Sequence, residues 1–107
     1  MISEKKENHL YIKLEKNEEN SFPQIIISLD FSSDLILDLL SLEITNEFQI
    51  SSLNKINEHI ISKGFCLVIA LNDSPQISKI ESLNIVLTLI EAENFIQMEQ
   101  IQRDLGI

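Results

Sequence analysis

Two nearly continuous apolar runs, separated by one amphipathic segment, constrain the fold of this chain most. The runs at residues 35–40 and 65–71 are too short for separate helices and too apolar for strands with one solvent-exposed face. Both are therefore predicted to be interior strands that are covered on both faces. The segment between them has one apolar helical stripe, made of Ile50, Leu53, Ile56 and Ile60. Strand, helix and strand in this order form a right-handed crossover, which predicts a sheet that is at least partly parallel.

The ends of this central helix carry clear local signals. Thr45 or Asn46 can cap its first turn, because their side-chain oxygens can accept from free backbone N–H groups. Lys63 places a cation in the last turn, and Gly64 is suited to the left-handed conformation that ends many helices. This is the best-defined helix that the sequence predicts.

Shorter elements are predicted on either side of this unit. Residues 1–8 are polar and are expected to be a disordered N-terminus, since they offer little to bury. Residues 9–15 alternate apolar and polar side chains, as a half-buried strand does. A helix over 74–81, opening on a cap and a proline, and a short edge strand over 84–87 follow the second apolar run.

One segment, residues 21–31, leaves two readings open. Ser21 can act as a cap and Pro23 lies in the first turn, where its missing N–H is harmless, which favours a short helix. The three successive isoleucines over 25–27 have strand propensity, so an extended conformation stays an alternative.

A final helix is predicted over residues 88–105. Thr88 and Glu91 have capping-box spacing, and Gly106 ends the helix. Glu99 and Arg103 are spaced for an ion pair on the helix surface. Its apolar side is expected to comprise Ala92, Phe95, Ile96, Met98 and Ile101.

The size and charge of the chain restrict its partners. A chain of 107 residues suits one domain with a single core. Seventeen acidic and eight basic residues give a net charge of -9, which disfavours direct binding to nucleic acid or to an anionic membrane and favours a basic protein partner. The longest apolar stretch has seven residues, so no signal peptide or membrane span is expected and a cytoplasmic location is predicted.

The residues that carry chemistry do not form a recognisable catalytic pattern. His9 and His59 are far apart and lack neighbours at metal-ligand spacing, and two glycines cannot build a phosphate-binding loop. Cys66 lies in an apolar run and is expected to be a small buried hydrophobe. The chain is therefore predicted not to be an enzyme and not to need a cofactor or metal. A pocket lined by two or more converging acidic side chains would favour an enzyme instead.

The pattern from residue 35 to residue 96 resembles the STAS domain, which sulfate transporters and anti-sigma-factor antagonists share. The matching segments are residues 35–40, 44–46, 63–68, 72–75 and 91–92. The resemblance implies an α/β fold of STAS-like type: a single domain over 9–107, with a mixed β-sheet and helices mostly on one face. It also implies a regulatory protein-interaction module. One class of partner that it implies is an anti-sigma-factor-like kinase, and one oligomeric state is a homodimer.

In that family, partners dock at the start of the long helix, and a Ser or Thr there is phosphorylated. The equivalent partner-binding residues in this chain are Thr45, Asn46, Glu47, Phe48 and Gln49. The family's serine and glycine are missing, so the usual phosphoserine switch is not expected. Glu47 is then either a fixed mimic of a phosphate or simply a first-turn acid beside a capping Asn46, and the second interpretation is favoured. The candidate phosphorylation sites are Thr45, Ser41 and Ser51.

The last helix gives a second resemblance. Residues 91–106 are similar to the C-terminus of small STAS-like bacterial proteins that carry the name ribonuclease Z. This chain lacks the histidine- and aspartate-rich motif that a dinuclear zinc nuclease requires. The alternative function is therefore an accessory protein associated with ribonuclease Z or with other RNA processing.

Overall fold

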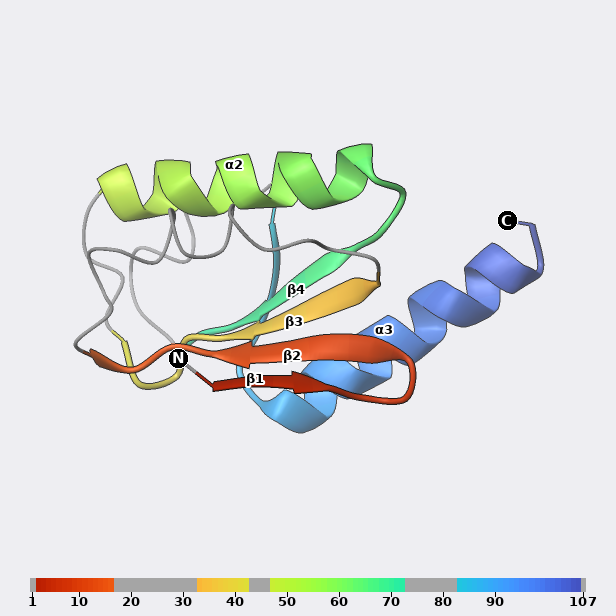
Figure 1. Ribbon diagram of the computed structural model, residues 1–107, viewed down its shortest axis with the longest axis horizontal. Helices are drawn as coiled ribbons and strands as arrows, with labels where there is room; N and C mark the ends of the chain where they lie inside the picture. The colour runs from red at the N-terminus through yellow and green to blue at the C-terminus, as the bar shows by residue number, and fades with distance from the viewer. Residues whose placement is uncertain (1, 17–32, 43–46, 73–82, 107) are drawn as a thin grey trace.

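A computed structural model describes residues 2–16, 33–42, 47–72 and 83–106 of the chain. Within these ranges the chain forms one sheet and two helices (Figure 1). The strands are β1 (Ile2–Lys5), β2 (His9–Lys13), β3 (Asp34–Asp38), β4 (Leu67–Ala70) and β5 (Asn84–Val86), and the helices are α2 (Glu47–Ser62) and α3 (Leu89–Asp104).

The sheet is mixed, and its strands lie in the order of the sequence. β1 pairs with β2 in antiparallel fashion, whereas β2, β3, β4 and β5 are parallel neighbours. The predicted crossover of β3, α2 and β4 is thus confirmed, with Leu35 opposite Leu67 in the register. β3 occupies the centre, and all five of its residues are buried.

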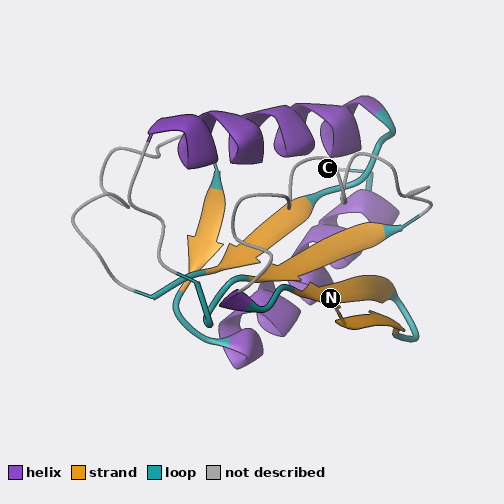
Figure 2. Cartoon of the chain, turned by 60° about the vertical axis from the view of Figure 1, so that its left-hand side comes forward, coloured by secondary structure: helices purple, strands orange, loops and turns teal. Residues whose placement is uncertain are grey.

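The two described helices lie on opposite faces of the sheet, α2 on one and α3 on the other (Figures 1 and 2). The expectation that the helices lie mostly on one face is therefore wrong for the described part of the chain. The reason is visible along β3, because a strand whose side chains are buried on both sides needs a cover on each of them. The coarser expectation, an α/β fold with a mixed sheet, is confirmed.

The hydrophobic core is divided into two layers by this sheet. Alternate residues of each strand enter the same layer, since side chains in a strand point to opposite faces in turn. The layer under α2 includes Ile12, Leu14, Leu35, Leu37, Leu39, Leu53, Ile56, Ile60, Leu67, Ile69 and Leu71. The smaller layer under α3 is formed by Ile36, Val68, Ala92 and Ile96.

Three predicted helix signals are confirmed, whereas the Thr45 or Asn46 cap of α2 lies outside the described residues and Lys63 follows the last turn of α2, in which His59 is the basic residue. The Thr88 hydroxyl oxygen accepts from the backbone N–H of Glu91 at 3.1 Å, which confirms the cap of α3. Gly64 follows α2 with a φ of 86°, a conformation that suits glycine because it has no Cβ. Gly106 has a φ of 73° just after α3.

Two expectations about exposure are corrected. Residues 2–5 are not frayed, because they form β1, which pairs with β2 through backbone hydrogen bonds and requires no buried side chains. Met98 and Ile101 are not part of the core, since their exposed fractions are 56% and 48%. They lie on the side of α3 that faces away from the sheet, opposite the buried Ala92 and Ile96.

Two predicted segments fall outside the described residues. These are the segment 21–31, for which helix and strand were both considered, and the short helix over 74–81. Both stay predictions.

The layer under α2 should dominate the stability of the fold. Leu37 is fully buried in it, so Leu37→Ala is expected to lower the free energy of unfolding by about 2–5 kcal/mol. Ile61, on the outer side of α2, is 57% exposed, and Ile61→Ala should change that free energy by less than about 0.5 kcal/mol. Urea denaturation followed by circular dichroism measures both, and equal losses would contradict the assigned core.

Candidate functional site

The face of the sheet under α3 carries polar side chains, unlike the face under α2. His9 and Tyr11 of β2 and Asp34 and Asp38 of β3 all point to this side, because they occupy alternate strand positions that share a face with Ile36. The exposed fractions of Asp34 and Asp38 are only 2% and 3%. Buried carboxylates need hydrogen bonds, so their partners define how this face is organised.

Asp34 is the centre of the first group. Its carboxylate forms an ion pair with Arg103 of α3, with an Oδ1–Nη2 distance of 3.0 Å and an Oδ2–Nη1 distance of 3.3 Å. Gln100 Nε2 donates to Oδ2 at 2.9 Å, and the backbone N–H of Cys66 donates to Oδ1 at 2.9 Å. Burial alone would raise the pKa of Asp34, but these donors outweigh it and hold the pKa below its usual value.

Two predictions about this region change. Arg103 bonds to Asp34 across the interface between helix and sheet, instead of to Glu99 one turn away, because a buried carboxylate offers a stronger partner than a partly exposed one. Cys66 is half-buried beside Asp34 and is not enclosed by apolar side chains alone. Burial raises the pKa of its thiol to about 12, and the Asp34 carboxylate adds to the effect, so the thiolate is disfavoured at neutral pH.

A chain of hydrogen bonds runs from Asp34 to the imidazole of His9. Because the Asp34 carboxylate only accepts, it orients the Gln100 amide so that Nε2 donates to it. Gln100 Oε1 then accepts from Asn8 Nδ2 at 3.1 Å, which leaves Asn8 Oδ1 to face His9 Nδ1 at 2.7 Å. This orientation requires the proton on Nδ1 of a neutral His9 and leaves Nε2 as the acceptor of the ring.

Asp38 organises the other end of the face. It accepts from the Tyr11 hydroxyl at 2.5 Å and from the backbone N–H of Leu40 at 3.0 Å. Burial and the bond to Asp38 raise the pKa of Tyr11 above its usual value, so the phenol stays protonated. The ammonium of Lys6 lies 5.7 Å from the centre of the Tyr11 ring and donates to Glu4 at 2.7 Å.

A pocket of about 230 Å³ opens between the β1–β2 hairpin, the sheet and the first half of α3. Its floor is apolar, and its walls carry opposite charges, a lysine on the hairpin and a glutamate on the helix. The lining residues are Lys6, His9, Tyr11, Ile36, Leu89 and Glu93. Burial lowers the pKa of His9, with Glu93 acting in the opposite sense, so the imidazole in this pocket is neutral at pH 7.

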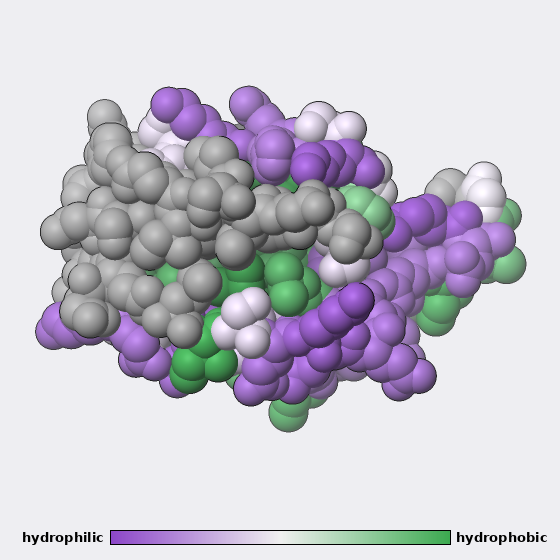
Figure 3. All heavy atoms as spheres, viewed as in Figure 1, coloured by the Kyte–Doolittle hydropathy of each residue, from purple (hydrophilic) through white to green (hydrophobic). Residues whose placement is uncertain are grey.

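An apolar stripe runs along the outer side of α3. We define the α3 stripe as Ile90, Met98, Ile101 and Leu105, whose exposed fractions are 72%, 56%, 48% and 68%. Figure 3 shows apolar side chains reaching the surface along the underside of this helix. Spacings of eight, three and four residues bring all four to one side of a helix with 3.6 residues per turn.

The start of α2, predicted to bind partners, is described only in part. Thr45 and Asn46 lie outside the described residues, and so do the side chains of Glu47 and Phe48, although α2 does begin at Glu47. Gln49 is 4% exposed, so its side chain cannot be a main contact for a partner.

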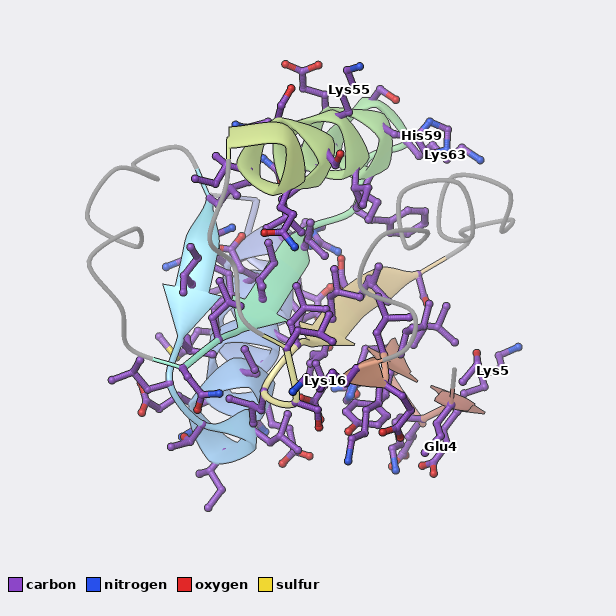
Figure 4. All side chains as sticks on the ribbon, turned by 90° about the vertical axis from the view of Figure 1, so that its left-hand side faces the viewer. Glu4, Lys5, Lys16, Lys55, His59 and Lys63 are labelled. Carbon is purple, nitrogen blue, oxygen red and sulfur yellow. The ribbon has the colours of Figure 1, made fainter. Side chains whose placement is uncertain are left out.

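Other sequence candidates lie at the surface. The candidate phosphorylation sites Ser41 and Ser51 are both exposed. His59 is partly exposed, as predicted, and lies near Lys63 beside α2, while Lys55 points away from the sheet (Figure 4). Among the described residues, no three His, Cys, Asp or Glu side chains are grouped so as to hold a metal ion.

Two comparisons with known proteins found no relative of this chain. No protein-family model matches the chain, and no curated protein is significantly similar to it. Neither of the two described helices has the length and apolar character needed to cross a lipid bilayer.

The Asp34–Arg103 pair should make stability depend on pH. The folded-state pKa of Asp34 lies below its ordinary value of 3.8, so the stabilisation is present above that pH and disappears as the pH falls through the folded-state pKa. Arg103→Leu should lower the free energy of unfolding by about 1–2 kcal/mol at pH 7, since Arg103 is partly solvated. In urea denaturation, the difference in free energy of unfolding between Arg103→Leu and wild type should shrink near pH 2. The control Gln102→Leu should change this free energy little at either pH. If the Arg103→Leu difference stays the same in acid, the pair does not stabilise the fold through its charges.

The hydrogen-bond chain predicts the tautomer of His9. Nitrogen-15 NMR of the imidazole at pH 7 should show the Nδ1–H form, with the His59 ring as an internal reference. Asn8→Ala removes the acceptor and should shift the ring toward the Nε2–H form that free histidine prefers. A wild-type ring already in the Nε2–H form would contradict the assigned orientation.

Proposed function

We propose that this protein is a non-enzymatic protein-interaction module of STAS-like type, and that its partner docks on the outer side of α3. The observation that carries the proposal is the α3 stripe, four large apolar side chains that the fold leaves about half exposed or more on one side of a helix. Apolar side chains exposed along one side of a surface helix are a common feature of interaction sites. As such a module, the protein would regulate by binding, without a phosphoserine switch.

The buried acids support a binding role over a catalytic one. Asp34 accepts four hydrogen bonds from the protein itself, three of them from α3, and Asp38 accepts two, from the Tyr11 hydroxyl and the backbone of Leu40. A carboxylate whose oxygens already accept hydrogen bonds from the protein stabilises the fold and is poorly placed to exchange protons with a substrate.

The charges around the stripe indicate the chemistry of the partner. α3 carries four acidic side chains, Glu91, Glu93, Glu99 and Asp104. Its one basic side chain, Arg103, is committed to Asp34. An apolar stripe with acidic flanks complements an amphipathic helix that has basic flanks, so we assign the site to a basic amphipathic helix of a protein partner. A second copy of this chain would bring the same acids together, which disfavours a homodimer through this face.

The start of α2 is a different candidate surface, implied by the resemblance alone. Because Gln49 is buried, a partner there would have to contact the other predicted residues, which are Thr45, Asn46, Glu47 and Phe48. Partners of the kinase or ribonuclease class can be tested on either surface, since the two surfaces can be altered independently.

A designed peptide tests the proposal directly. The probe is a synthetic helix with leucines on one side and lysines flanking them, and its binding is followed by fluorescence anisotropy. We expect Met98→Asp and Ile101→Asp each to weaken binding about tenfold or more, because each places a charge in the contact. Added salt should also weaken binding, since acidic flanks attract the lysines.

Three controls make the result specific. Ile61→Asp places the same charge on the exposed side of α2 and should leave binding unchanged. A peptide with glutamates in place of lysines should not bind. The double variant Glu47→Ala with Phe48→Ala separates the surfaces: if it abolishes binding while the α3 variants do not, the α3 assignment is wrong. Self-association seen by sedimentation, lost in Ile101→Asp, would also overturn the assignment in favour of a second copy.

A further inference from the structure

The pocket beside α3 is lined by residues that, apart from Glu93, have no part in the docking role. Its two charged walls come from different elements, Lys6 from the hairpin after β1 and Glu93 from α3. Ile36 and Leu89 supply apolar surface between them. At about 230 Å³ the space is smaller than the pockets of roughly 300–1,000 Å³ that hold drug-sized ligands, so its ligand must be small.

One wall of the pocket accepts hydrogen bonds. Glu93 is exposed, and within the described residues its carboxylate makes no hydrogen bond or ion pair, so its charge is available to a ligand. The neutral His9 ring offers Nε2 as an acceptor, because Asn8 holds the proton on Nδ1. Glu93 acts electrostatically on both His9 and Lys6, and all three residues line the pocket. Together Glu93 and His9 suit a ligand ammonium group, which has only donors to offer.

Lys6 brings hydrogen-bond donors to the same pocket. The Lys6 ammonium has three N–H donors, and Glu4 accepts from one of them at 2.7 Å, which leaves donors for a ligand carboxylate. The ring of Tyr11 lies beneath this ammonium and keeps it near the pocket. The Tyr11 hydroxyl donates its hydrogen bond to Asp38, so it does not compete as a donor to the ligand.

We propose that this pocket binds a free α-amino acid with an apolar side chain, its ammonium held by Glu93 and His9 and its carboxylate by Lys6. The side chain of the ligand would rest on Ile36 and Leu89. An amine without a carboxylate would be repelled by Lys6, and an acid without an ammonium group would be repelled by Glu93, so only a zwitterion satisfies both walls.

Ligand titrations of the full chain test this assignment with three probes of similar shape. The probes are L-leucine, isoamylamine, which lacks the carboxylate, and 4-methylpentanoate, which lacks the ammonium group. Binding is followed through the methyl NMR signals of Ile36 and Leu89. We expect L-leucine to bind about tenfold more tightly than either of the other two, because each loses one charge-assisted contact.

Two variants assign the walls. Glu93→Gln should weaken the binding of L-leucine about tenfold without weakening the binding of 4-methylpentanoate. Lys6→Met should weaken the binding of L-leucine about tenfold without weakening the binding of isoamylamine. Asp104→Asn and Lys5→Met, matched changes on the same helix and hairpin outside the pocket, should leave all three affinities unchanged.

Several results would overturn the proposal. One is the absence of any methyl shift with L-leucine up to about 10 mM. Another is equal binding of the amine and the amino acid, which would mean a simple cation site. A third is unchanged L-leucine affinity in both wall variants. None of these results tests the docking proposal for the α3 stripe, because the peptide assay measures binding at a different surface.

Discussion

Asp34 connects parts of the chain that the sheet alone does not hold together. From the first position of β3 it accepts hydrogen bonds from Gln100 and Arg103 of α3 and from the backbone at Cys66, just before β4. Through Gln100 the same network reaches Asn8, at the end of the turn between β1 and β2. The apolar layer under α3 is small, and apolar contacts alone would let the helix shift along the sheet. These directional hydrogen bonds therefore fix its position. The stripe and the pocket both depend on that position.

The elements that could be predicted from sequence are those that local patterns specify. The runs at 35–40 and 65–71 are uniformly apolar, and a strand of that kind must be covered on both sides, so their interior and parallel placement followed directly. The ends of α2 and α3 depend on Gly64 and on Thr88 with Glu91, which act within one turn. No comparable signal marked β1, because Ile2–Lys5 pairs only through its backbone and buries nothing.

The candidate sites required contacts that sequence spacing does not reveal. Arg103 was assigned to Glu99 because the two are four residues apart, whereas its partner Asp34 is 69 residues away. One signal was present: Asp34 and Asp38 flank an apolar triplet at positions that share one face of a strand, and acids in such positions must find partners. The pocket draws on the hairpin, two strands and α3, so only the assembled fold brings its walls together.

β1 has a consequence for the behaviour of the protein at high concentration. Among the described residues β1 is an outermost strand, with one row of backbone N–H and C=O groups that β2 does not use, and such an edge can recruit strands from other molecules. The strand is only four residues long, and Glu4 and Lys5 carry charge on both of its sides. A short charged border of this kind discourages fibrillar stacking, so the open side of the sheet can remain in water without nucleating aggregates.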